Sequence, residues 1–148
     1  MKEKAGHFAI KRIYDESADD DGCRVLVDRL WPRGVSKRAA ALDAWLKDIA
    51  PSHALRRWFH ARPRHWLMFR KRYLLELSQP AAEQALEELY RMAARPRPLT
   101  LVFSSRHPEH NNAAVLKQLL EGMRKPPSSS GGAAAAGMRA RARASRRS

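Results

Sequence analysis

The stretch from Cys23 to Gly34, which reads CRVLVDRLWPRG, decides the fold class of this 148-residue chain. Its first six residues form a short, β-branched run, which is typical of a strand covered on both faces. Pro32 and Gly34, near its end, stop any regular element. The stretch therefore predicts a buried strand that leads directly into an irregular loop.

Further strands are expected on both sides of this stretch. Residues 8–14 (FAIKRIY) alternate apolar and polar side chains, so that Phe8 and Ile10, and with them Tyr14, are expected to mark one face of a strand. Residues 98–105 (PLTLVFSS) form the clearest strand after the first stretch. Residues 42–49 (LDAWLKDI) fit either a helix or a strand, and we favour a strand for the middle of this segment.

Capping residues and apolar spacing predict several helices between and after these strands. Ser36 and Ser52 are expected N-caps, because a serine hydroxyl accepts a hydrogen bond from the first turn of a helix. Pro63 and Pro80 are expected at first helical positions, where the missing N–H of proline costs nothing. The expected helices cover residues 37–41, 53–59, 63–78, 80–94 and 110–124.

Strands that alternate with helices predict an α/β fold. We expect a small, open, mainly parallel sheet of about four strands with helices packed on it. This domain would cover residues 1–125. Residues 126–148 consist mostly of Ser, Gly, Ala and Arg after two prolines, so they offer almost nothing to bury and are predicted to form a disordered tail.

The chain is strongly basic. It has 29 Lys and Arg against 15 Asp and Glu, which gives a formal net charge of +14. Five arginines lie in the predicted tail, so most of the excess belongs to the domain. Such an excess favours polyanionic partners, namely nucleic acid, nucleotides, anionic lipid or acidic protein.

The cysteine content and the hydropathy pattern indicate a cellular compartment. The single cysteine, Cys23, excludes an internal disulfide and suits a reducing environment. No secretory signal is visible, and no run approaches the ~20 apolar residues that span a bilayer. We therefore expect a cytoplasmic protein with no membrane partner, and we expect the Cys23 thiol to be buried and inert.

Candidate ligand-binding residues lie beyond the carboxyl ends of the predicted strands, where open parallel sheets bind their ligands. These segments are rich in cations, hydroxyls and amides. Each leads to a helix N-terminus, whose free N–H groups and dipole favour an anion. We therefore predict a phosphate or carboxylate site at this edge, formed by Arg29, Trp31, Arg33, Lys37, Ser105, Arg106, His110 and Asn111.

Each of these residues also has a purely structural interpretation. Arg29 and Arg33 would grip an anion by a bidentate fork, and Lys37 would act as a point charge. The alternative is that these cations only stiffen the loop by pairing with Asp28, Asp43 or Asp48. Both interpretations stay open on the sequence alone.

The aromatic and amide candidates also have two interpretations each, one as ligand-binding residues and one as structural residues. Trp31 would stack on a base or pack in the core. His110 is the one candidate for a catalytic acid or base, and its alternative is a structural role at a helix start. Asn111 would contact the ligand or cap a helix. No cofactor motif is present. The spacing of the histidines at positions 53, 60 and 65 does not suit a metal site, so none is predicted.

A basic band supports a rival function. It consists of Arg56, Arg57, Arg62, Arg64, Arg70, Lys71 and Arg72. With the arginine-rich tail, this band would hold a phosphate backbone, which makes the protein a nucleic-acid-binding module without chemistry. A third alternative is a protein-interaction domain for acidic partners. The sequence does not specify the oligomeric state.

Several segments together resemble the YeaO-like family, a bacterial domain of unknown function (DUF488). They are Lys11–Asp15, Arg24–Gly34, Trp45–Ser52, Arg57–Phe59, Phe69–Tyr73 and Glu109–Asn111. The resemblance covers about residues 8–122, and its string VDRLWPRG is long and unusual. It implies a small α/β fold and an intracellular location without an established activity. It also favours a strand over residues 42–47 and places 29–37 and His110–Asn111 in the family signature.

Overall fold

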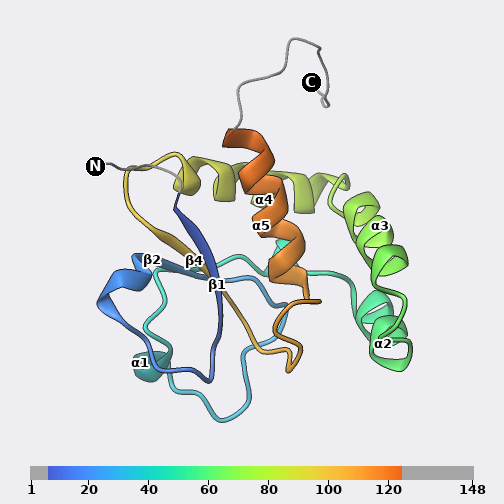
Figure 1. Ribbon diagram of the computed structural model, residues 1–148, viewed down its shortest axis with the longest axis horizontal. Helices are drawn as coiled ribbons and strands as arrows, with labels where there is room; N and C mark the ends of the chain where they lie inside the picture. Colours follow the sequence, from blue (N-terminus) through green and yellow to red (C-terminus); the bar gives the residue numbers. More distant parts are fainter. Residues whose placement is uncertain (1–6, 125–148) are drawn as a thin grey trace.

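The computed structural model describes residues 7–124, where four parallel strands form one sheet with helices packed on it (Figure 1). The predicted α/β fold class is therefore confirmed. The predicted tail, residues 126–148, lies outside the described residues. In chain order the elements are β1 (Phe8–Arg12), 3₁₀-helix η1 (Asp19–Asp21), β2 (Cys23–Leu26), α1 (Lys37–Ala40), β3 (Ala44–Trp45), 3₁₀-helix η2 (Lys47–Ile49), α2 (His53–Ala61), α3 (Trp66–Glu76), α4 (Pro80–Ala93), β4 (Leu99–Phe103) and α5 (Asn112–Arg124).

The strand order is β1-β4-β2-β3, so the last strand of the chain lies inside the sheet. One edge of β4 pairs with β1, in a register that joins Phe8 to Leu99. Its other edge pairs with β2, in a register that joins Cys23 to Leu99. Every residue of β2 and β4 is buried, which explains why both strands are mostly apolar, with Arg24 and Thr100 as their polar residues.

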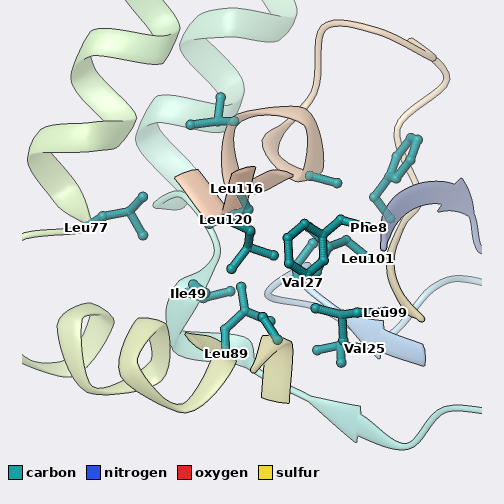
Figure 2. Close-up of a cluster of buried hydrophobic side chains, with 14 of the residues drawn as sticks. Phe8, Val25, Val27, Ile49, Leu77, Leu89, Leu99, Leu101, Leu116 and Leu120 are labelled. Atoms are coloured by element: carbon teal, nitrogen blue, oxygen red, sulfur yellow. The ribbon is translucent and has the colours of Figure 1, made fainter. Parts of the chain in front are cut away.

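One face of the sheet carries the main core. Alternate residues of β4, from Leu99 to Phe103, point to this face and meet α4 and α5 (Figure 2). Leu89 of α4 and Leu116 and Leu120 of α5 are fully buried there. Phe69 and Tyr73 of α3 extend the same core. The helices α3, α4 and α5 therefore cover this face of the sheet, and α1 and the loops cover the opposite face.

The opposite face carries a smaller apolar cluster. Leu26 of β2 and Val102 of β4 pack there with Ile13 and Ala40. The loop after β2 and the edge of β3 cover this cluster with partly buried side chains, namely Trp31, Val35, Leu42 and Trp45. The loop that carries half of the predicted site is thus also a covering layer of the sheet.

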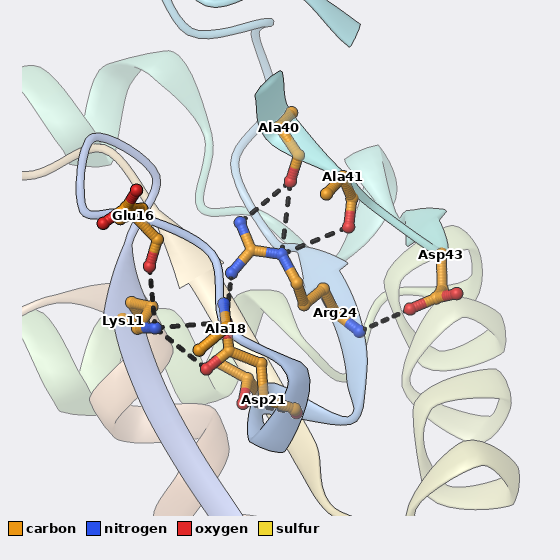
Figure 3. A network of polar contacts seen from close by, with 9 residues as sticks. Lys11, Glu16, Ala18, Asp21, Arg24, Ala40, Ala41 and Asp43 are labelled. Atoms are coloured by element: carbon orange, nitrogen blue, oxygen red, sulfur yellow. Dashed lines mark hydrogen bonds and ion pairs between the residues drawn. The ribbon is translucent and has the colours of Figure 1, made fainter. Parts of the chain in front are cut away.

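A polar network on this second face surrounds a buried arginine (Figure 3). The guanidinium of Arg24 donates to Asp21 at 2.7 Å and to the carbonyl oxygens of Ala40 (2.8 Å) and Ala41 (3.1 Å). The ammonium of Lys11 approaches the same Asp21 carboxylate at 2.9 Å. Ala41 adopts a left-handed φ of 49° just after α1. The network holds η1, β2 and α1 together.

Most predicted elements are confirmed. The side chain of Ser36 accepts from Ala39 at the start of α1, and that of Ser52 accepts from Leu55 at the start of α2. The strand favoured within residues 42–49 is present as β3. The thiol of Cys23 is buried, and burial raises its pKa.

Three expected positions were wrong. The long helix begins at Trp66 and not at Pro63, because residues 62–65 form a turn in which the N–H of His65 donates to the carbonyl of Arg62. The last helix begins at Asn112 and not at about residue 110. Tyr14 does not share the buried face with Phe8, since β1 ends at Arg12 and the chain then turns.

Candidate functional site

A carboxylate lies in the middle of the carboxyl edge of the sheet. One oxygen of Asp28 accepts from the backbone N–H (2.8 Å) and the hydroxyl (2.7 Å) of Ser104, just after β4. Its other oxygen accepts from the side-chain amide of Asn112 at 3.2 Å. These bonds tie the ends of β2 and β4 to the start of α5. They also place a negative charge where the sequence predicts an anionic ligand.

Arg12, at the end of β1, was not among the predicted site residues. Its guanidinium donates to the carbonyl oxygens of Ser105 (2.8 Å) and Ser104 (3.2 Å) and lies 5.0 Å from the ring centre of Tyr14. Only the pairing of β1 with β4 brings these residues together, and the strand order was not predicted. No local signal in the sequence could have identified this contact.

Arg29 follows β2 and is held by the protein itself. Its guanidinium donates to the carbonyl oxygens of Ala50 (2.9 Å) and Pro51 (3.5 Å) and lies 4.0 Å from the carboxylate of Asp48. The loop-stiffening alternative is therefore supported for this residue, with two carbonyl oxygens as nearer partners than the aspartate.

The remaining predicted residues of this region are Trp31, whose ring is held by the protein, and the cations Arg33 and Lys37. The indole N–H of Trp31 donates to Val35 at 2.6 Å, and its ring meets the ring of Trp45 edge to face at 5.3 Å. The side chains of Arg33 and Lys37 are exposed and have no partner among the described residues. Trp31, Lys37 and Trp45 also line a hollow of about 220 Å³.

The loop after β4 carries the other four predicted residues. Asn111 is buried, and its side chain accepts from the N–H of Ala114 and donates to the carbonyl of His107 at 2.7 Å. The hydroxyl of Ser105 accepts from the N–H of His107. Arg106 is exposed and has no side-chain partner within residues 7–124. Asn111 thus acts as the cap of α5.

The eight predicted residues form two groups. The loops start side by side, because β2 and β4 are neighbours in the sheet. They then diverge, since Trp31 covers the small cluster on one face and His110 packs beside α3 on the helical face. Of the eight residues, Trp31 and Lys37 line one hollow, and no hydrogen bond or ion pair joins the two groups within residues 7–124.

Three aromatic rings are stacked beside the start of α5. The ring of His110 lies 4.6 Å from that of Trp66, at an interplanar angle of 8°. The ring of His107 lies 5.3 Å from that of His110, at an interplanar angle of 11°. Trp66 in turn packs against Phe59 and Phe69, both part of the main core or packed on it. The stack therefore extends from the core to the exposed ring of His107.

The helices α2 and α3 and the turn between them, residues 53–76, form the most basic part of the described chain. Residues 49–75 contain seven Arg and Lys and no Asp or Glu. Within the described ranges, none of the seven forms an ion pair, and all but Arg70 are exposed. Arg70 donates to the neutral side chain of Gln118 in α5. We call this segment the basic hairpin.

One tryptophan joins the two helices of the basic hairpin. The guanidinium of Arg72 lies 4.3 Å from the ring centre of Trp58, and that of Arg62 lies 5.3 Å from it. A hollow of about 440 Å³ next to this ring is lined by Ser52, Trp58, Arg72 and Glu76. The carboxylate of Glu76 accepts from the backbone and hydroxyl of Ser52. Cations and an aromatic ring thus lie side by side on this surface.

The described residues give less support to metal binding and to acid–base catalysis. Among residues 7–124, no group of three His, Cys, Asp or Glu side chains is placed to hold a metal ion. The hydroxyl of Tyr73 is buried and donates to Ile49, and burial raises its pKa well above the ordinary value. No carboxylate hydrogen-bonds to His110 in the described part of the chain. No helix there is long and apolar enough to cross a membrane.

Comparisons with known proteins identify uncharacterised relatives. A family model described as "Inactive DUF488-N3 subclade" matches residues 7–134. "Uncharacterized protein YeaO" of Escherichia coli K12 is 43% identical over 114 residues, which cover 76% of this chain and 96% of that protein. An uncharacterized protein of Mycobacterium tuberculosis H37Rv is 43% identical over 113 residues, or 76% and 92% of the two chains. No solved structure matches.

Proposed function

This chain belongs to the DUF488 family, in the subclade described as inactive, and from this premise we propose that it binds the phosphate backbone of nucleic acid. The resemblance to the YeaO-like family read from the sequence is confirmed. Because the subclade is described as inactive, binding suits the chain better than catalysis. The ring of His110 is also stacked with two others, which supports a structural role for it over proton transfer.

The unneutralised charge of the basic hairpin carries the proposal. Six exposed cations that repel one another and form no ion pair within the described residues destabilise a compact protein, unless an external anion neutralises them. On α2, Arg56 and Arg57 lie with His53 and His60 at helical spacings of three and four, so the four side chains share an exposed face. A phosphate backbone offers closely spaced charges along such a face.

The test is the salt dependence of nucleic-acid binding by the full chain. For a labelled single strand, log affinity should fall with log salt, with a slope of about 0.7 for each neutralised phosphate. The double variant Arg56→Glu, Arg57→Glu should lower this slope by about 1.4 if each arginine contacts one phosphate. The matched control, Arg95→Glu with Arg97→Glu, reverses the same number of exposed charges outside the basic hairpin.

Two outcomes would contradict the proposal. Equal losses in the two double variants would show that only net charge matters. Competition by polyglutamate as strong as that by nucleic acid would point to an acidic protein partner instead. The aromatic rings among the cations favour nucleic acid, because bases stack on such rings and carboxylate side chains do not.

A small anion at the carboxyl edge is the second candidate function. It is supported by the exposed side chains of Arg33, in the loop after β2, and Lys37, at the start of α1, neither of which has a partner within residues 7–124. Lys37 also lines the hollow beside Trp31. The carboxylate of Asp28 opposes an anion deeper in the edge, so the ligand would stay on the side of α1.

Phosphate or sulfate should then stabilise the protein, by about 1.4 kcal/mol at tenfold saturation. Arg33→Ala should abolish this gain with little loss of intrinsic stability, and Arg33→Lys should restore only part of it. If neither anion raises the melting temperature of the wild type, this second function is excluded.

A further inference from the structure

We infer that the exposed ring of His107, at the outer end of the Trp66–His110–His107 stack, is a docking platform for an unpaired nucleobase. The inference rests on the proposed function and narrows it, because it makes single-stranded nucleic acid the preferred ligand. It is carried by ring geometry and not by charge.

The stack has a closed end and an open end. Trp66 is fixed at the closed end by Phe59 and Phe69. His110 stacks with both Trp66 and His107 and is partly buried. His107 is exposed, and in the described part of the chain no aromatic ring covers its outer face. A planar ligand can therefore extend the stack in one direction only.

The backbone around His107 is already fixed in place. Its N–H donates to the hydroxyl of Ser105 at 3.1 Å, and its carbonyl accepts from the side chain of Asn111 at 2.7 Å. Asn111 is itself buried and caps α5. Because folding has already ordered this ring, a stacking ligand does not have to immobilise it, and less affinity is lost on binding.

The stack is also connected to the cations that would bind phosphates. Trp66 is the first residue of α3 and follows Arg64 in the basic hairpin. Arg106 precedes His107 and is exposed. A strand whose base stacks on His107 would therefore have exposed arginines in both neighbouring segments as partners for its phosphates. Duplex bases are covered on both faces by their neighbours, so only an unpaired base can use the platform.

The experiment compares two labelled strands of about 20 nucleotides with the full-length protein, a thymidine oligomer and an abasic strand of equal length. The two strands have the same phosphates, and only the first has bases. Wild type should bind the thymidine strand at least about fivefold more tightly. His107→Ala should remove most of this preference, whereas His107→Phe, which keeps a flat ring, should retain it. His7→Ala removes an exposed imidazole before β1 and should change nothing.

The outcomes separate the inference from the proposed function. If wild type binds both strands equally, or if His107→Phe loses as much as His107→Ala, the platform is excluded while backbone binding stands. If wild type binds neither strand at low salt, the proposed function fails as well. Retention of the base preference by His107→Ala would also overturn the inference.

Discussion

Two groups of cationic side chains in this protein lie in opposite surroundings. Arg24 is 3% exposed, and its guanidinium reaches one carboxylate and two carbonyl oxygens. The exposed cations of the basic hairpin have no acidic partner in the part of the chain that the structure describes. Arginine occurs in both surroundings, and the difference lies in the hydrogen-bond acceptors that the fold places around the guanidinium.

This difference separates stabilising cations from available ones. A buried guanidinium whose donors are all satisfied holds elements together, and removing it leaves an unpaired carboxylate behind. An exposed cation without acceptors adds little to stability, and its charge can act on a partner. The following predictions test this division, beginning with the buried group.

Arg24→Ala should have the largest effect on stability. It leaves the Asp21 carboxylate with only Lys11 and the backbone N–H of Ala18 as donors and removes the donors to the carbonyl oxygens of Ala40 and Ala41, so the free energy of unfolding should fall by about 3–5 kcal/mol. Arg24→Lys should restore only part of it, since lysine lacks the planar fork. Urea unfolding measures the loss. The control Arg57→Ala should stay within about 0.5 kcal/mol of wild type, and similar losses in both would contradict the division.

Two glycines provide the next largest contrast. Gly22, beside Asp21, and Gly34, in the loop after β2, have positive φ angles of 68° and 78°. A Cβ on Gly22 would lie 2.2 Å from the carbonyl oxygen of Pro98, whereas one on Gly34 meets nothing within 4 Å. Gly34→Ala should therefore cost about 1–2 kcal/mol from backbone strain alone. Gly22→Ala should cost at least about 1 kcal/mol more, as measured by urea unfolding, and equal costs would show that the loop relaxes freely.

Acid should weaken the buried network selectively. Burial alone would raise the pKa of Asp21, but hydrogen bonds from Lys11, Ala18 and Arg24 together lower it below the ordinary value of 3.8. A lowered pKa stabilises the fold above the ordinary value, and this contribution is lost as the pH falls through the lowered one. Asp21→Asn should therefore be less stable than wild type at pH 7, and the difference should shrink below about pH 4. Urea midpoints at both pH values check this, and a constant difference would contradict it.

Deletion of residues 126–148 should have the smallest effect. Every described core residue lies between Phe8 and Leu120, so the deletion removes cations without removing core contacts. The melting temperatures of the full and shortened chains should nearly coincide. A drop of about ten degrees, which exceeds 1 kcal/mol for a domain of this size, would show that this segment packs on the domain.

Local chemistry explains which elements the sequence predicted. The strands β2 and β4 follow from short β-branched runs, and the starts of α1 and α2 follow from the capping serines Ser36 and Ser52. Both signals act within a few residues, so a short stretch of sequence is enough to predict these elements. The start of α3 was wrongly predicted at Pro63, because a proline suits a turn as well as the first turn of a helix. The choice between the two depends on the chain reversal that brings α3 back onto α2.

Contacts between distant segments explain what the sequence did not predict. The sequence placed eight residues near one edge, but the directions of the two loops depend on which face of the sheet Trp31 and His110 cover. The burial of Arg24 depends on Ala40 and Ala41, whose carbonyl oxygens are turned toward it at the end of α1. Neither residue carries a local mark of its role. The predicted anion site accordingly stays a prediction.

The position of β4 between β1 and β2 has a consequence for the order of folding events. Among the described strands β1 pairs only with β4, so the pairing of this edge strand has to wait until Leu99 has been synthesised. Such distant pairing is slow, because closing a long loop costs conformational entropy before any favourable contact forms. During synthesis the apolar β1 and β2 segments are therefore exposed without their central partner, at a stage when unpaired strands can aggregate. This exposure during translation should thus end when residues 99–103 leave the ribosome and β4 can pair with both strands.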